Sequence, residues 1–143
     1  MKSAQIVLIE DNPADVLLVK MALKENGIEH ALTRFETGEE AIRVLCGETD
    51  GGFFVPDAIL LDLNTPRTDG FEALHRFKEF PGLSGVPIAI LTSSRDRRDK
   101  HRAALQGARY IEKPSQLNEF LTSVGNAVKE MLGTDRTASS DKS

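Results

Sequence analysis

The stretch LLDLNTPRTDG, residues 60–70, brings an apolar run to a single aspartate, Asp62, and then continues into a polar turn. The turn holds Asn64, Pro66 and Gly70, which are residue types that favour chain reversal. An aspartate at the end of a buried strand either caps the next turn or is a reactive group held at the edge of a sheet. The segments on either side decide between these two interpretations.

Around this stretch, the chain alternates short β-like runs with helical patterns, which predicts parallel strands joined by crossover helices. The runs IVLI, AILL and IAIL suit strands that are buried on both faces of a sheet. Five strands are predicted, at Gln5–Glu10, His30–Phe35, Asp57–Leu61, Pro87–Leu91 and Arg109–Glu112. The predicted fold class is therefore α/β, with a doubly wound five-stranded parallel sheet flanked by five helices.

The last predicted helix has one apolar stripe that runs from Leu117 to Leu132 at helical spacing. We expect Gly133 to end this helix. The residues that follow are polar and have nothing to bury, so they are predicted to form a disordered tail. The chain is accordingly divided into a domain at residues 1–133 and a tail at residues 134–143.

Composition excludes several classes of protein. A length of 143 residues suffices for one domain, and 40% hydrophobic with 28% charged residues is ordinary for a globular protein. The net charge of −4 argues against a generic nucleic-acid binder, which needs clustered Lys and Arg. Cys46 is the only cysteine, so a disulfide framework is excluded. We interpret Cys46 as a small core residue. With neither a secretory signal nor a membrane span in the sequence, we expect a cytoplasmic protein.

Two further segments receive simple structural interpretations. The segment CGETDGGFFVPD, residues 46–57, is predicted to be a surface loop in which Phe53 and Phe54 pack against the domain. The run RDRRDKHR, residues 95–102, mixes acids with bases, so we interpret it as the solvated face of a helix. The three histidines do not have the spacing of metal ligands.

Polar residues follow four of the five predicted strands, and the second strand offers nothing chemically notable. The carboxyl ends of parallel strands meet at one edge of the sheet, where ligand sites gather. In strand order, these residues are Glu10 and Asp11, then Asp62, then Thr92, then Lys113. Three crowded carboxylates repel one another, so either one takes up a proton or a cation lies between them. Oxygen ligands of this kind suit Mg²⁺, which leaves room for a phosphoryl group.

The same edge could support phosphoryl transfer. A carboxylate can act as a nucleophile toward phosphorus and form an acyl phosphate. The reaction mainly needs positioning and charge neutralisation, which Mg²⁺, the Lys113 ammonium and the Thr92 hydroxyl would supply around Asp62. Taken singly, each of these residues is better explained as a cap, a turn residue or a solvated charge than as part of a reactive site. Their occurrence after separate strands favours a phosphoryl-transfer site.

The stretches VLIEDN, LLDLNTPRTDG, LTSS and YIEKP, in this order, resemble the receiver domains of two-component response regulators over residues 4–132. The resemblance implies the flavodoxin-like receiver fold. It also implies a single-domain regulator of a phosphorelay, in which a sensor histidine kinase passes a phosphoryl group to Asp62 in a Mg²⁺-dependent reaction. Such a protein is a signalling switch rather than an enzyme, and it acts through a protein-interaction surface.

The resemblance also implies the ligands of the ion. Asp11 and Asp62 would bind Mg²⁺ directly, and Asn64 would complete the protein ligands through its backbone carbonyl. Glu10 would assist through a water molecule.

The resemblance further implies how the phosphoryl group is sensed. Lys113 would pair with the phosphoryl oxygens, and Thr92 would hydrogen-bond one of them. Tyr110 would be the aromatic residue whose pose reports the state, although on the residues alone it is also interpretable as an edge-strand side chain with its hydroxyl in water. The peptide bond between Lys113 and Pro114 would be cis, because proline lowers the cost of that isomer. The face made by the fourth helix, fifth strand and fifth helix would carry the output.

Some positions depart from the family pattern. Thr65, Arg67 and Thr68 stand where many relatives carry apolar residues, which predicts a different kinase-facing surface beside the phosphorylation loop. Asn64 and Ser94 occupy positions that tune hydrolysis of the phosphoaspartate in the family. Ser94 has no acid or amide with which to position a water molecule.

Three other functions fit the residues less well. A phosphatase of the haloacid dehalogenase type needs a general acid at position 64, and Asn64 cannot serve as one. A flavin site in the same fold needs a phosphate cradle, whereas the first loop, EDNPAD, is acidic. The intact acidic residues, Thr92 and Lys113 argue against a receiver-like binding module that is not phosphorylated.

The stretch DLNTPRTDG and the long loop before PDAILLDL resemble the regulators that accompany phytochrome-type light-sensing kinases. This resemblance implies a phytochrome-type histidine kinase as one partner and an unnamed downstream protein as the other. No membrane partner and no direct nucleic-acid partner is expected. Such relatives can form homodimers, so a monomer and a homodimer are both open.

Overall fold

The structure is a computed structural model that describes residues 3–47, 55–67 and 69–141. In these residues, one parallel sheet has the strand order β2-β1-β3-β4-β5, which confirms the predicted five-stranded doubly wound arrangement. The strands are β1 (Ala4–Ile9), β2 (His30–Phe35), β3 (Ala58–Leu61), β4 (Ile88–Thr92) and β5 (Arg109–Glu112). The predicted strands agree with these bounds to within one residue at each end.

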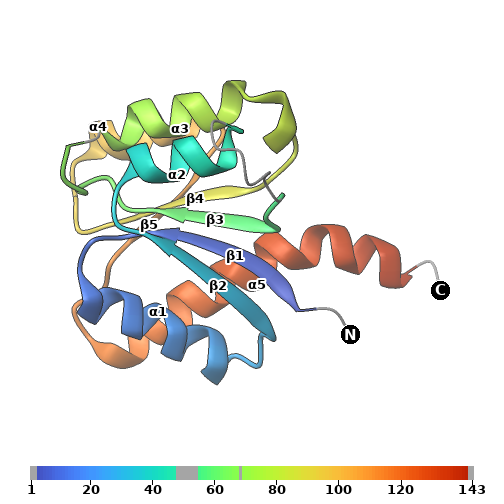
Figure 1. The fold of residues 1–143 in the computed structure, drawn as a ribbon. Coiled ribbons are helices and arrows are strands. Elements are labelled where there is room, and N and C mark those ends of the chain that lie inside the picture. The colour runs from blue at the N-terminus through green and yellow to red at the C-terminus, as the bar shows by residue number, and fades with distance from the viewer. Residues whose placement is uncertain (1–2, 48–54, 68, 142–143) are drawn as a thin grey trace.

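Helices cover both faces of the sheet (Figure 1). They are α1 (Pro13–Glu25), α2 (Gly38–Leu45), α3 (Gly70–Glu79), α4 (Arg97–Leu105) and α5 (Leu117–Asp141), with a short 3₁₀ turn at Pro81–Leu83. One apolar core lies between the sheet and the α1–α5 pair, and a second lies under α2, α3 and α4. Strands β1, β3 and β4 contribute to both cores because their side chains alternate between the two faces.

Side-chain caps begin four helices directly after the loops that follow the strands. Asn12, Thr37, Asp69 and Asp96 each accept a hydrogen bond from a backbone N–H two or three residues ahead. These bonds satisfy donors that the first helical turn leaves without partners. The loops between strand and helix are therefore held close to the carboxyl edge of the sheet.

The register aligns the ends of the central strands. Ile9 of β1 lies opposite Leu61 of β3, and Leu61 lies opposite Ile90 of β4. The residues that follow β1 and β3, Glu10 and Asp62, consequently leave the sheet side by side. This alignment is what assembles the polar edge that was predicted from the sequence.

Helix α5 continues to Asp141, although we expected it to end at Gly133. A glycine in a helix interior costs only about 1 kcal/mol relative to alanine. The sequence after Gly133, TDRTASSD, contains no proline that would block the hydrogen-bond ladder. The prediction of the helix end was therefore wrong, and the division into a domain and a tail stays a prediction.

The peptide bond between Lys113 and Pro114 was expected to be cis, but it is trans in the described chain. Proline lowers the preference for the trans isomer without removing it. Cys46 forms the C-cap of α2 and packs, partly buried, against the second core. Phe53 and Phe54 lie outside the described residues. No described helix combines the length and the apolar character needed to cross a membrane.

Candidate functional site

Three carboxylates meet at the carboxyl edge of the sheet. Glu10 and Asp11 follow β1 and Asp62 follows β3, and each offers an oxygen atom that lies within 4.8 Å of the others. Glu10 is 1% exposed and Asp62 is 5% exposed, whereas Asp11 is open to solvent. The structure therefore brings together the three acids that the sequence predicted at this edge.

Lys113 lies among these acids, directly after β5. Its Nζ donates to Oε1 of Glu10 at 2.9 Å and to Oδ2 of Asp62 at 2.9 Å. It also donates to Oδ2 of Asp15 at 2.7 Å, a contact that sequence reasoning did not predict. Asp15 stands in the first turn of α1, directly after the loop that carries Glu10 and Asp11, and this position close to the edge was the signal that could have identified it.

Burial and charge act in opposite directions on the ionisable groups. Burial raises the pKa of Glu10 from 4.5 to about 7, and the negative charge of Asp62 adds to this effect while the hydrogen bond from Lys113 opposes it. Burial lowers the pKa of Lys113, but its hydrogen bonds to Asp15, Glu10 and Asp62 together outweigh this, so its pKa is raised. The Lys113 ammonium therefore stays charged, whereas the Glu10 carboxyl titrates close to neutral pH.

Hydrogen bonds connect Asp62 to β4. Its Oδ1 accepts from the backbone N–H of Asn64 at 2.9 Å. The Asn64 side-chain amide donates in turn to Oγ1 of Thr92 at 3.2 Å, and the same oxygen accepts from the backbone N–H of Ser94 at 3.2 Å. The Thr92 hydroxyl is fully buried, so it is held between the Asp62 loop and the loop that leads to α4. The metal role of the Asn64 carbonyl stays a prediction.

Tyr110 of β5 points to the same loop. Its hydroxyl donates to the Ser94 carbonyl at 2.9 Å, and burial raises its pKa. This hydroxyl is therefore bonded to the protein, and the role of Tyr110 in reporting the state stays a prediction. Ser94 also donates through Oγ to Oδ2 of Asp99 in α4 at 2.6 Å. The loop after Thr92 is thus fastened to both β5 and α4.

Strand β2 does contribute to the edge, against the sequence-based expectation. The Arg34 guanidinium donates through Nε to the Glu10 carbonyl at 2.9 Å and through Nη2 to the Asp11 carbonyl at 3.1 Å. Sequence reasoning missed this residue because Arg34 lies one residue before the end of its strand, so only the length of the side chain brings it to the edge.

The loop after Asp62 has an unusual backbone. Arg67 has a φ of 66°, in the left-handed region that side-chain-bearing residues seldom adopt. Gly70 packs closely against Leu63, since a Cβ atom added at position 70 would lie 2.7 Å from the Cα atom of Leu63. Thr65, one of the departures from the family pattern, is 6% exposed, and its hydroxyl has no partner among the residues described.

Residues 6–125 match the family described as the response regulator receiver domain. The chain belongs to this family. It is 40% identical to the response regulator Rcp1 of Synechocystis sp. over 66% of this chain and 65% of that protein. Its fold is similar to that of phosphorylated RcpA, a cyanobacterial phytochrome response regulator, with 32% identity, a TM-score of 0.85, and coverage of 93% of this chain and 96% of RcpA. The Mn²⁺-bound form of Rcp1 is similar at 33% identity and a TM-score of 0.81, over 92% of this chain and 96% of the other.

Membership of this family indicates what the polar edge of the sheet is used for. Receiver domains receive phosphoryl groups from histidine kinases in two-component signalling, so this protein is a component of a phosphorelay. The flavodoxin-like receiver fold and the phosphorelay role predicted from the sequence are both confirmed.

The acidic edge of this receiver domain fits a divalent cation. Glu10, Asp11 and Asp62 offer only oxygen atoms, which are the ligands that hard cations prefer. The negative charge of these acids and of Asp15 exceeds the single positive charge of Lys113, so a cation would reduce their mutual repulsion. Of the three groups, Asp11 is exposed and would meet an arriving ion first.

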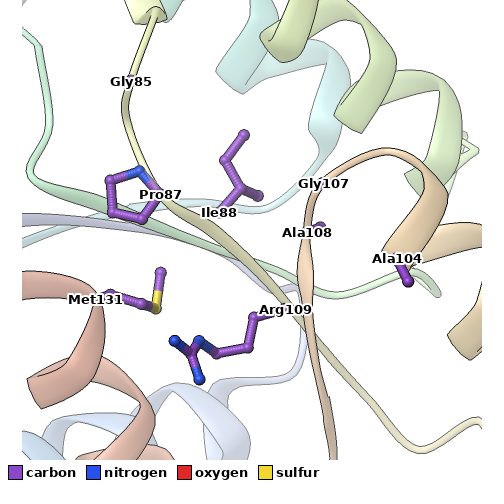
Figure 2. A pocket seen from close by; sticks show the side chains of 8 residues that line it. All are labelled: Gly85, Pro87, Ile88, Ala104, Gly107, Ala108, Arg109 and Met131. Carbon is purple, nitrogen blue, oxygen red and sulfur yellow. The ribbon is translucent and has the colours of Figure 1, made fainter. Parts of the chain in front are cut away.

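A separate pocket of about 540 Å³ opens at the other end of β4 and β5 (Figure 2). Pro87, Ile88 and Met131 line it together with Arg109, which is paired with Glu130 at 2.7 Å. Pro87, Ile88 and Arg109 stand at the amino ends of β4 and β5, so the pocket lies away from the acidic edge. With its one charged lining residue already paired, it offers no counterpart to the chemistry of that edge.

Proposed function

We propose that Asp62 is the phosphoryl acceptor and that it reacts with the phosphohistidine of a sensor histidine kinase. The contact between Lys113 Nζ and Asp62 Oδ2, at 2.9 Å, carries this proposal. It places an ammonium against a buried carboxylate that also faces a cluster of cation ligands. This arrangement would stabilise a phosphoryl group on Asp62, because its oxygens need positive charge around them.

In this proposal, an Asp62 oxygen attacks phosphorus while the bond from phosphorus to the histidine nitrogen breaks, and the electron pair of that bond returns to the imidazole. Asp11 and Asp62 would hold Mg²⁺ directly, with the Asn64 carbonyl and a water on Glu10, and the ion would neutralise charge on the phosphoryl oxygens. Lys113 exchanges carboxylate contacts for phosphoryl oxygens. Thr92 turns its hydroxyl toward the new group.

The product acts as a signalling switch rather than as an enzyme. Phosphorylation adds close to two negative charges at the edge. The movement of Thr92 would change the loop that Tyr110 and α4 share, and so alter the face made by α4, β5 and α5 for a downstream protein. Similarity to RcpA, a phytochrome response regulator, supports a phytochrome-type kinase as the donor. The exchange is proposed to take place in the cytoplasm.

The test is to incubate the protein with Mg²⁺ and acetyl phosphate and to look by intact mass spectrometry for one added phosphoryl group. Asp62→Asn should abolish the adduct. The matched control is Asp69→Asn, because Asp69 lies in the same loop but caps α3, and asparagine caps a helix equally well. An adduct that persists in Asp62→Asn would identify a different acceptor. Equal labelling in the presence of excess EDTA would rule out the metal-dependent reaction.

A further inference from the structure

We propose that Arg34 is a positioning residue that sets the affinity of this receiver domain for its divalent cation. It would do so by fixing the backbone of the loop that carries Glu10 and Asp11. This inference rests on the proposed function, since it concerns the metal ligands named there. It concerns a residue outside the acidic cluster, on the edge strand β2.

The contacts of Arg34 are directed at the backbone of the metal-binding loop. Its Nε and Nη2 donate to the carbonyls of two successive residues, Glu10 at 2.9 Å and Asp11 at 3.1 Å. A guanidinium presents its donors in one rigid plane, so two bonds to adjacent carbonyls fix both peptide groups relative to β2. Leu8 of β1 pairs with Arg34, which sets the side chain beside the end of β1.

Asp11 depends on this support more than the other acids do. Glu10 and Asp62 are buried, and both contact Lys113. The Asp11 carboxylate is exposed and has no hydrogen-bond or ion-pair partner among the residues that the structure describes. The position of this carboxylate therefore follows from its backbone. Arg34 holds that backbone at the carbonyl of Asp11 itself.

The positive charge of Arg34 acts in the opposite direction, because it repels a cation. The Arg34 side chain is 28% exposed, and its Nη1 lies 3.8 Å from the Glu36 carboxylate, so water and this partner weaken the repulsion. We therefore expect positioning to dominate. The two effects predict opposite results when the charge is removed, and this makes them separable by experiment.

The experiment measures Mg²⁺ affinity by calorimetric titration of the unphosphorylated protein. Arg34→Met should weaken binding by about tenfold, the usual scale for a residue that orients a metal ligand. Arg34→Lys keeps the charge but cannot span both carbonyls, so it should also weaken binding. The matched controls are Arg43→Met and Arg43→Lys, at an exposed arginine on α2 across the sheet. Both controls should bind Mg²⁺ like the wild type.

Further measurements separate positioning from a general structural role. Thermal unfolding in EDTA should show Arg34→Lys folded, with a melting temperature near that of the wild type. The rate of labelling by acetyl phosphate should return to the wild-type value at saturating Mg²⁺, because Arg34 does not touch the reacting atoms.

Binding that is unchanged or tighter in Arg34→Met would overturn the inference, as would a lower melting temperature with unchanged affinity. If Arg34→Met does not fold, Arg34→Lys decides the question alone: weaker binding supports the inference, and wild-type binding overturns it. A wild-type protein that binds no Mg²⁺ would instead overturn the proposed function.

Discussion

At the scale of single residues, Glu10 is the acid whose protonation folding changes most clearly. Its pKa rises from 4.5 in the unfolded chain to about 7 in the fold, with burial as the largest cause. Between these two pH values the folded protein holds a proton that the unfolded chain has released. Stability from this group is therefore complete below pH 4.5 and is lost as the pH rises to about 7.

Glu10→Gln should remove this loss, because glutamine stays neutral. We expect the variant to melt roughly 3 °C higher than the wild type in EDTA at pH 8, and to show little difference at pH 5. The measurement is thermal unfolding followed by circular dichroism. A variant that is less stable than the wild type at both pH values would show that the Lys113 contact outweighs the cost of burying the charge.

The affinity for Mg²⁺ should also depend on the protonation of Glu10, but it should increase with pH where the stability decreases. A bound cation favours the ionised carboxylates, so binding releases the Glu10 proton. The affinity of the wild type should rise between pH 6 and pH 7.5 and then level off, since the pKa lies at about 7. Calorimetry in two buffers of different ionisation enthalpy measures the released proton. A pH-independent affinity with no proton release would contradict this prediction.

Arg67 stores backbone strain in the loop after Asp62. It is exposed, and its φ of 66° lies where glycine is tolerated and a β-branched residue is not. Arg67→Gly should be neutral or stabilise the fold by up to about 1 kcal/mol, whereas Arg67→Val should destabilise it by about 1–2 kcal/mol. Urea unfolding measures both. Equal stabilities for the two variants would mean that the loop relaxes to another conformation.

At the scale of elements, α1 and α5 are joined by an unusual contact. The Asn26 side-chain amide, just after α1, donates to the Leu121 carbonyl of α5 at 3.1 Å and to the Ala22 carbonyl at 2.8 Å. A Cβ atom at position 125 of α5 would collide with this amide. Glycine, which has no Cβ atom, leaves room for the Asn26 side chain at this point of the helix. The glycine thus permits a polar contact between the two helices.

Gly125→Ala should therefore destabilise the protein by about 1–3 kcal/mol, although alanine is the better helix former. Asn26→Ala alone should cost about 1 kcal/mol through its lost hydrogen bonds. The double variant should recover most of the loss caused by Gly125→Ala, because the collision is gone. Urea unfolding of all four proteins tests this, and strictly additive costs would contradict it.

The elements differ in how far the sequence could predict them. Strand positions were predicted because runs such as AILL are apolar on both faces, and this occurs where strands are buried in the middle of a parallel sheet. The end of α5 was not predicted, because Gly133 is only a weak signal for a helix end. Strand order alone did not predict the roles of Asp15 and Arg34. Asp15 contacts Lys113 from a helix, and Arg34 contacts the Asp11 carbonyl through the length of its side chain.

At the scale of the whole molecule, the site was predictable to the extent that it follows from strand order. Glu10, Asp62 and Lys113 each follow a different strand, and the register brings those strand ends together. The hydrogen bonds that connect the site to the α4 side were not visible in the sequence, because they depend on side chains that meet only in the fold. The Asn64 amide donates to the Thr92 hydroxyl, and the Tyr110 hydroxyl donates to the Ser94 carbonyl. We expect a change at Asp62 to reach α4 through these bonds.

Helix α4 is the element that phosphorylation should affect most. Of its residues, only Ala103 is buried. The helix is held by the Ser94–Asp99 hydrogen bond and by the Arg102 guanidinium, which lies 4.3 Å from the centroid of the Phe71 ring. Elements with few buried contacts open most readily. A shift of Thr92 toward a phosphoryl group would reach α4 through Ser94, whose backbone N–H contacts the Thr92 hydroxyl.

Hydrogen exchange measured by mass spectrometry should therefore show a change in protection at residues 97–105 when Mg²⁺ and acetyl phosphate are added. Residues 13–25 of α1, which pack with α5 on the opposite face of the sheet, should change little (Figure 1). Asp62→Asn under the same conditions should show neither change. If α1 responded as strongly as α4, the signal would have to cross the buried sheet, and the weakly packed helix could not be its main route.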